Sequence, residues 1–300
     1  MIIDMRYHIV SLVSVFLALA LGILIGNALG DRVLVKQQTR LIERMEADVN
    51  RLTTERRDLQ RAVGAERAAH RNADRFGRAV LPVLVADRLY GKQVVLVRLN
   101  PAAEVRPIEE LQAVLRKAGA EVAMSLTFLQ DPAAMPLEKR AGAATILGVP
   151  DPGAAGLPVE VLRGVARELA RGTPTLLTSY LVDAQVVSAH GGTKRPAQLA
   201  IVVGGATDEA RAAAAKSLDL PLIDALKEVG LTVAVVETSD VKVSLIKQYR
   251  GKGVLTVDNA DTPAGQLALI WALAMGRVDN YGVKETARQF LPLTGEYALP

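Results

Sequence analysis

The sequence predicts an α/β protein carried on an N-terminal transmembrane helix and a parallel, dimeric coiled-coil stalk. Three observations lead to this fold class: a charge-free run at residues 9–29, a proline-free heptad pattern across residues 33–75, and then short apolar strands alternating with helices. The chain therefore divides into a membrane anchor at 1–30, a stalk at 31–78 and a globular domain at 79–300. For the globular domain we expect a doubly wound fold with a mainly parallel sheet, because β-α-β units bury both sheet faces.

The charge-free run is expected to cross a membrane as one helix. Its 21 residues would rise about 31 Å, which is close to the hydrocarbon thickness of a bilayer. Cleavage is the alternative, because Ala28 and Gly30 have the small side chains of a signal-peptidase site before Asp31. Retention is favoured because the run exceeds a typical signal h-region, and because small residues recur every fourth position around Gly22 and Gly26, where two membrane helices could pack.

The segment after the membrane run repeats apolar residues with a heptad period. With Val35 at position a, seven of the nine a and d positions up to residue 63 are apolar. β-branched residues at a with Leu or Met at d favour two parallel strands, and Arg56 at an a position would cost stability while fixing register. A single amphipathic helix is the alternative, and it would need a wider apolar face. The predicted seam of the homodimer consists of Val35, Ile42, Met45, Val49, Leu52, Arg56, Leu59 and Val63.

Charge and composition exclude several classes of function. The net charge is +4, and residues 31–78 account for all of it with 12 basic and 8 acidic side chains. A basic stretch beside a membrane helix favours contact with anionic lipid head groups. The neutral globular part, with 4% aromatic residues in the whole chain, argues against nucleic-acid binding. The chain has no cysteine, so disulfides and thiolate metal sites are excluded.

The globular part is expected to alternate strands with helices, as one sheet or as two similar lobes joined near residue 190. Short β-branched or apolar runs predict the strands, and amphipathic stretches bounded by proline or glycine predict the helices. The predicted strands are 93–99, 121–128, 144–149, 174–182, 198–203, 231–237 and 254–258. The predicted helices are 107–117, 159–171, 208–216, 221–229 and 265–275. Residues around His190 are expected to form a glycine-rich loop.

Few residues of the globular part carry recognisable chemistry. Gly204 and Gly205 lie between a strand and a helix, but they lack the spacing of a phosphate-binding loop, so we expect an ordinary turn capped by Asp208. His190 is a weak candidate metal ligand. Asp258 and Asp261 follow a strand, where carboxylates could hold a divalent cation, although capping of a turn and of the next helix is favoured.

No arrangement of nucleophile, base and orienting group is visible, so we expect neither an enzyme nor a resident cofactor. The other two histidines are His8, beside the membrane run, and His70, which is expected to be a solvated residue of the stalk. The six methionines form no cluster, and Met45 is explained as a seam residue.

Motifs at both ends of the chain resemble one family. Residues 5–26 (MRYHIVSLVSVFLALALGILIG), 256–269 (TVDNADTPAGQLAL) and 281–284 (YGVK), the last followed by Leu291 and Pro292, closely resemble the MctB-like family, which is named for a mycobacterial copper-transport outer-membrane protein. The resemblance implies an N-terminal membrane anchor, an α/β domain outside the cytoplasm and a link to copper transport or homeostasis. The implied outside position disagrees with the positive-inside rule. More basic residues follow the membrane run than precede it, so that rule would keep the α/β domain in the cytoplasm.

Two functional hypotheses follow. The first is a copper transport or homeostasis protein, although the cysteine-free sequence shows no methionine cluster or histidine pair of the kind that selects copper. The second is a non-enzymatic scaffold of the cell envelope, of the kind associated with cell separation, whose dimeric stalk presents the α/β domain to an unidentified envelope protein. A receptor that binds a small ligand near Asp258 and Asp261 is a weaker third alternative.

Overall fold

A computed structural model describes the backbone of residues 5–101, 105–193 and 195–293, and their side chains except those of residues 5 and 27–39. The chain forms two compact units, Met1–Arg71 and Asn72–Pro300. We call the second unit the head.

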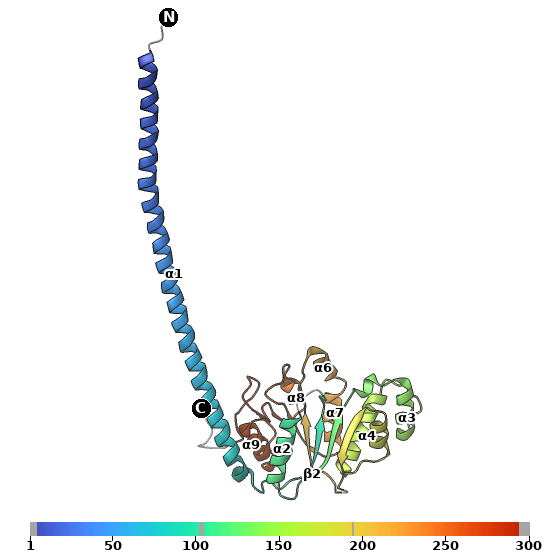
Figure 1. The fold of residues 1–300 in the computed structure, drawn as a ribbon. Helices are drawn as coiled ribbons and strands as arrows, with labels where there is room; N and C mark the ends of the chain where they lie inside the picture. The colour runs from blue at the N-terminus through green and yellow to red at the C-terminus, as the bar shows by residue number, and fades with distance from the viewer. Residues whose placement is uncertain (1–4, 102–104, 194, 294–300) are drawn as a thin grey trace. The chain divides into compact units, whose positions relative to one another are not determined.

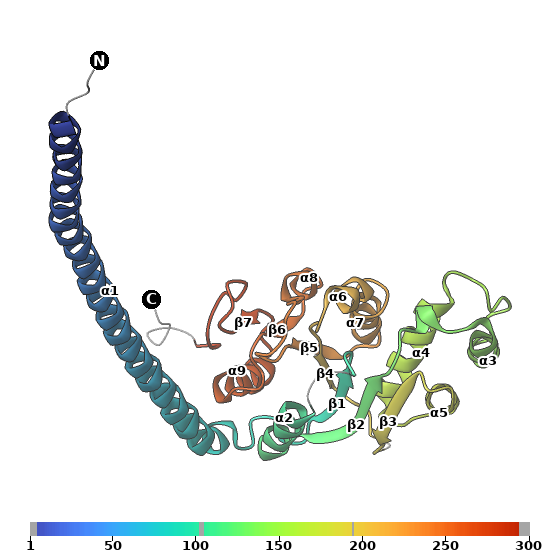
Figure 2. The ribbon, with the colours of Figure 1, turned by 45° about the horizontal axis from the view of Figure 1, so that its top comes forward.

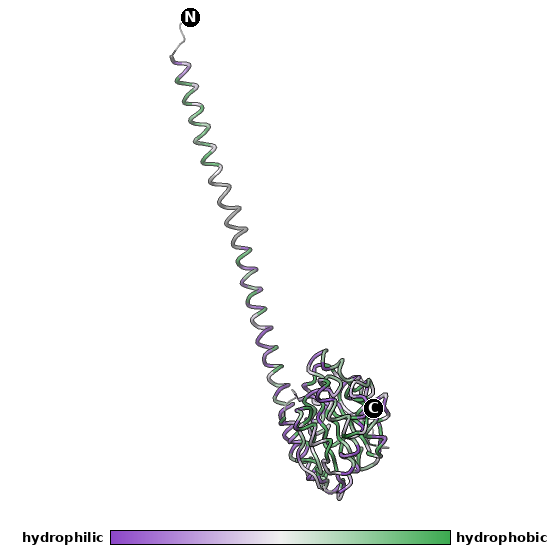
Figure 3. The backbone as a smooth tube through the Cα atoms, turned by 90° about the vertical axis from the view of Figure 1, so that its right-hand side faces the viewer, coloured by the Kyte–Doolittle hydropathy of each residue, from purple (hydrophilic) through white to green (hydrophobic). Residues whose placement is uncertain are grey.

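The described residues of the first unit lie in one helix. Helix α1 runs from Met5 to Val85 without interruption (Figure 1). The apolar run and the heptad segment therefore share one helix, with Pro82 as its only proline. Figure 3 shows the change along this helix from apolar first turns to turns of mixed character. Residues 5–81 contain no proline, so no backbone donor is missing across the two segments, which explains the continuity of the helix.

The described residues of the head form one seven-stranded sheet, in the order β3-β2-β1-β4-β5-β6-β7. All neighbouring strands are parallel except β2 and β3, which are antiparallel. The order reverses between β1 and β4, where Val95 lies beside Ala200. The strands are β1 Gln93–Arg98, β2 Glu121–Phe128, β3 Val187–Gly191, β4 Leu199–Val203, β5 Thr232–Val236, β6 Leu255–Val257 and β7 Asn280–Tyr281.

Helices cover both faces of this sheet. Figure 2 shows α4 and α7 on one side and α2 and α9 on the other. Alternate strand residues divide the core accordingly: Val95 packs in the cluster with α4 and α7, and Val94 packs in the cluster with α2 and α9. The helices are α2 Arg106–Lys117, α3 Leu137–Leu147, α4 Leu157–Arg171, α5 Leu176–Asp183, α6 Glu209–Ala214, α7 Asp219–Glu228, α8 Ile246–Arg250 and α9 Pro263–Ala274, with the 3₁₀ turn η1 at Pro132–Ala134.

Two of the predicted strands are helices. Residues 144–149 fall mainly in α3, and residues 174–182 fall mainly in α5. Short apolar runs do not distinguish a buried strand from a buried helix. For α5 the deciding partner comes from α4: the buried Glu168 carboxylate accepts the N–H groups of Thr175, Leu177 and Thr178 at 2.9–3.2 Å. These are donors that a helix N-terminus leaves unpaired.

The expected loop around His190 is also wrong. Residues 187–191 form β3, an edge strand paired with β2. The strand sequence VSAHG has one β-branched residue and ends in Gly191, with Gly192 next in the chain, so it lacks the usual strand signal. Helix α8 and strand β7 were not predicted either. Of the two arrangements expected for the domain, the structure has the single sheet.

Candidate functional site

Several buried polar side chains of the head lie just after the carboxyl ends of the parallel strands. In open α/β sheets, ligands bind at the carboxyl ends of the strands. The loops after β5 and β6 begin with Glu237 and Asp258, and both side chains are buried. Their partners come from residues 283–284 and from the segment before α8. This end of the sheet is therefore the candidate site of the head.

Asp258 holds the turn that follows β7. Its Oδ1 accepts the N–H of Val283 at 2.9 Å, and its Oδ2 accepts the N–H of Lys284 at 3.0 Å. Gly282, with φ of +147°, lets the turn approach, because a Cβ there would lie 2.1 Å from Asp258 Oδ1. Both carboxylate oxygens thus have backbone partners, and the carboxylate acts as an acceptor for two N–H groups.

The same turn brings a cation to Glu237. Lys284 Nζ donates to Glu237 Oε2 at 2.9 Å, and Ser244 Oγ donates to that oxygen at 2.7 Å. Glu237 Oε1 accepts the N–H of Leu245 at 2.6 Å. The Glu237 side chain is fully buried, whereas Lys284 keeps 26% of its side chain exposed. A buried carboxylate needs such a set of donors to remain charged. This pair was not predicted from the sequence, because 47 residues separate its members.

A second buried network joins α7 to α8. Asp219 Oδ2 accepts from the Tyr249 hydroxyl at 2.5 Å, and Asp219 Oδ1 accepts from Arg211 Nη2 at 2.6 Å. Burial raises the pKa of Asp219, and the Arg211 guanidinium opposes that rise. Burial likewise raises the pKa of Tyr249 well above its ordinary value of 10.0, so the phenol stays protonated. The Nε and Nη1 atoms of Arg211 are buried without a hydrogen-bond partner in the described part of the chain.

The glycine turn after β4 serves this network. A Cβ on Gly204 would lie 2.7 Å from the Tyr249 hydroxyl, and the N–H of Gly205 donates to that hydroxyl at 3.3 Å. Asp208 accepts the N–H of Arg211 at 2.8 Å and caps α6, as predicted. The close approach of Tyr249 explains why residue 204 is a glycine, and no bound phosphate is needed to account for it.

The three candidate metal ligands of the head do not meet. His190 lies on β3 at one edge of the sheet, whereas Asp258 follows β6 near the other. Asp261 accepts the N–H of Ser239 at 2.7 Å. The helix cap expected of Asp261 is wrong, because the neighbouring Thr262 caps α9. Among the described residues no three His, Asp or Glu side chains form a group able to hold a metal.

His190 has one nearby polar partner. The Ser188 hydroxyl lies 3.3 Å from His190 Nε2 on the exposed side of β3. A serine beside a histidine is part of a nucleophilic triad only if a third group orients the ring. In the described part of the head, no carboxylate makes that hydrogen bond.

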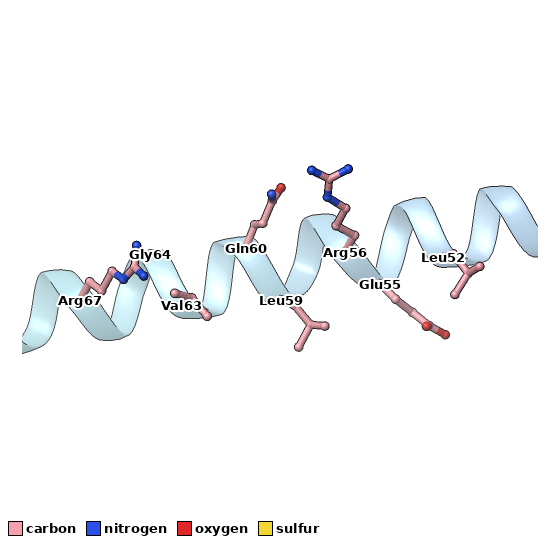
Figure 4. A pocket seen from close by; sticks show the side chains of 8 residues that line it. All are labelled: Leu52, Glu55, Arg56, Leu59, Gln60, Val63, Gly64 and Arg67. Carbon is pink, nitrogen blue, oxygen red and sulfur yellow. The ribbon is translucent and has the colours of Figure 1, made fainter. Parts of the chain in front are cut away.

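In the first unit, the predicted seam forms an exposed face of α1. The side chains of Ile42, Met45, Val49, Leu52, Leu59 and Val63 are 47–66% exposed. Figure 4 shows the C-terminal part of this face, where Arg56 projects to one side of the helix and Leu52, Glu55 and Leu59 project to the other. Gly22 and Gly26 have open space around them, and the side chain of Val35 lies outside the described residues. A row of large apolar side chains with this spacing is typical of a coiled-coil surface.

The comparison with protein families decides the identity of the chain. A family model described as "Copper transport outer membrane protein, MctB" matches residues 2–292. The chain belongs to this family. This confirms the resemblance of the end motifs.

The MctB family also supplies similar curated proteins. Proteins named "Copper transporter MctB" from Mycobacterium bovis and from two strains of Mycobacterium tuberculosis are each 31% identical over 129 residues. The match covers 43% of this chain and 38% of each relative's length.

The two C-terminal motifs of the MctB resemblance meet in the structure. Asp258 belongs to the motif 256–269, and Val283 and Lys284, whose N–H groups it accepts, belong to the motif 281–284. Thr256 and Asn280 add a further side-chain hydrogen bond between β6 and β7. The two motifs thus contribute residues to β6 and β7. They also form the turn after β7, from which Lys284 reaches Glu237.

The N-terminal motif of the MctB resemblance is the apolar start of α1. The stretch Arg6–Gly26 is long and apolar enough to cross a membrane, and no part of it is buried within the structure. Its composition is thus compatible with a membrane anchor.

Proposed function

We propose that the chain is a single-pass membrane protein with its head outside the cytoplasm, and that it acts in copper transport or homeostasis. The observation that carries this proposal is the MctB family model, which covers residues 2–292. The relatives named as copper transporters support it, as does the apolar stretch Arg6–Gly26.

A deletion strain tests the copper role. We expect loss of this gene to increase copper sensitivity, and the intact gene to restore tolerance. A version truncated after Arg71, which keeps the first unit and lacks the head, should not restore it. Normal copper tolerance together with a division or chaining defect would contradict the copper role.

That second outcome would support the alternative, an envelope scaffold. The observation that favours the scaffold is the long exposed helix, which would hold the head away from the membrane for a protein partner. A helix rises about 1.5 Å per residue, so a stalk helix over residues 31–78 would itself be several nanometres long.

We propose that two chains pair in parallel along the exposed face of α1. The apolar a and d side chains support this, and Glu55 lies at the g position beside the Arg56 a position. In a parallel pair, Arg56 of one chain faces Glu55 of the second copy, so each buried cation gains an anion. Gly22 and Gly26 would let the membrane segments approach as well.

Cysteine cross-linking tests the parallel pair without background, because the chain has no native cysteine. We expect Leu52→Cys, at a d position, to form a disulfide-linked dimer on mild oxidation of the full chain in detergent. Thr54→Cys, at the outer f position, is the matched control and should remain monomeric on a denaturing gel. Equal cross-linking of both variants, or of neither, would contradict the paired seam.

The outside position of the head is also a proposal. The basic residues at 32, 36, 40 and 44 oppose it, whereas the family description supports it. The exposed Tyr90 offers a test site in the head. A Tyr90→Cys variant should react with a membrane-impermeant maleimide in intact cells. Reaction only after lysis would show that the head is cytoplasmic.

A further inference from the structure

The stalk contains a polar layer directly after its last apolar seam residue. Counting the heptads on from Val63 at position a places Glu66 at d and His70 at the next a. Glu66 Oε1 lies 3.2 Å from His70 Nε2, and the two side chains are 72% and 79% exposed. These two side chains therefore occupy seam positions and already lie together on one chain.

Parallel pairing of two chains would double this set of potential metal ligands. Coiled-coil axes lie about 8–10 Å apart, so residues at a and d of one chain contact the same layers of the other. Two Glu66 carboxylates and two His70 imidazoles would then converge. Two like charges at one layer repel each other, and an acid in a seam costs stability unless a cation compensates it.

We propose that this layer, in the parallel dimer, is a site for a divalent transition-metal ion. Two imidazole nitrogens and two carboxylate oxygens suit Cu²⁺, Zn²⁺ or Ni²⁺, whereas Cu⁺ prefers sulfur ligands. One chain supplies only half of the ligands, so the site exists only in the pair. The inference rests on the proposed dimer and would give the stalk a direct role in metal handling.

Arg67 is the competing partner. It lies at position e, beside the d layer, where its guanidinium could pair with Glu66 of the second copy. That ion pair would neutralise the carboxylates without a metal. The experiment must therefore separate a metal site from a salt bridge.

The test is calorimetric titration of the metal-free full chain in detergent with Zn²⁺ and, separately, with Cu²⁺. We expect one ion per pair of chains, bound more tightly than about 1 μM. His70→Ala should abolish this binding, and Glu66→Gln should weaken it at least about tenfold. His190→Ala, which removes the histidine of the head, is the matched control and should bind like the native chain.

Electron paramagnetic resonance of the Cu²⁺ complex gives a second readout. Imidazole nitrogen couplings should be present in the native chain and absent in His70→Ala. Because His70 and Glu66 are exposed on a helix, both variants should keep the native helical content by circular dichroism.

The dimer is checked in the same preparation by the Leu52→Cys cross-link, formed in metal-free buffer. A cross-linked dimer whose metal binding depends on His70 supports the site. A cross-linked dimer that binds no ion, or binds equally after His70→Ala, overturns the metal site and leaves the dimer standing. Absence of the cross-link overturns the dimer and the site together.

Discussion

Lys284 Nζ lies 2.9 Å from Glu237 Oε2, while the backbone N–H of Lys284 donates to Asp258 at 3.0 Å. One residue thus ties the loops after β5 and β6 to the turn after β7. The head can be followed through this region by fluorescence, because its Trp271 is the single tryptophan of the chain. The Trp271 indole N–H donates to the carbonyl of Leu84 at 3.1 Å, so its emission should change when the head unfolds.

Replacing Lys284 with methionine should destabilise the head. The change leaves the fully buried Glu237 without its cation while keeping the backbone contact to Asp258. We expect a loss of about 3 kcal/mol in the free energy of unfolding, measured by urea titration. The exposed Lys247→Met is the control. Adding Glu237→Gln should recover part of the loss, and additive effects would show that the two side chains do not interact.

Removing the Tyr249 hydroxyl should leave two buried groups unpaired. In Tyr249→Phe, Asp219 Oδ2 and the N–H of Gly205 both lose a partner. We expect a cost of about 1–3 kcal/mol, read from the same urea titration. Tyr90→Phe, at a site that is 80% exposed, is the matched control. A native-like stability for Tyr249→Phe would contradict the network.

The raised pKa of Asp219 should make the stability of the head depend on pH. Its pKa is 3.8 in the unfolded chain and higher in the folded head, because burial disfavours the carboxylate. The folded state therefore holds more protons between the two values, and this contribution to stability falls as pH rises through that window. Urea titrations from about pH 4 to pH 7 should show this slope as a difference between the native chain and Asp219→Asn. Parallel curves would contradict it.

Glu168 should be required for α5. Its carboxylate accepts three backbone N–H groups, and Glu168→Gln would point an amide at one of these donors. We expect a loss of about 1–3 kcal/mol and faster amide hydrogen exchange in residues 175–178. The exposed Glu138→Gln should leave both measurements unchanged. Unchanged exchange in Glu168→Gln would show that α5 forms without this cap.

Local sequence patterns were sufficient to predict an element where the periodicity of its buried apolar residues matches a strand or a helix. Strand 121–128 was predicted with its observed bounds, and α2 and α4 were predicted to within two residues, because apolar periodicity and flanking proline or glycine determine both kinds of element. The same patterns indicated the apolar run at residues 9–29 and the exposed apolar face of α1. The Asp208 cap could also be predicted locally, because its carboxylate lies three residues from Arg211, whose N–H it accepts.

The sequence alone therefore determined the order of most elements, the family and the long N-terminal helix. Only the tertiary structure decided that residues 174–182 form a helix, that residues 187–191 form an edge strand, and that Lys284 meets Glu237. The physical reason is the same in each case. A donor or acceptor from a distant segment, such as Glu168 at the start of α5 or β2 beside β3, satisfies backbone or charged groups that the local sequence leaves open.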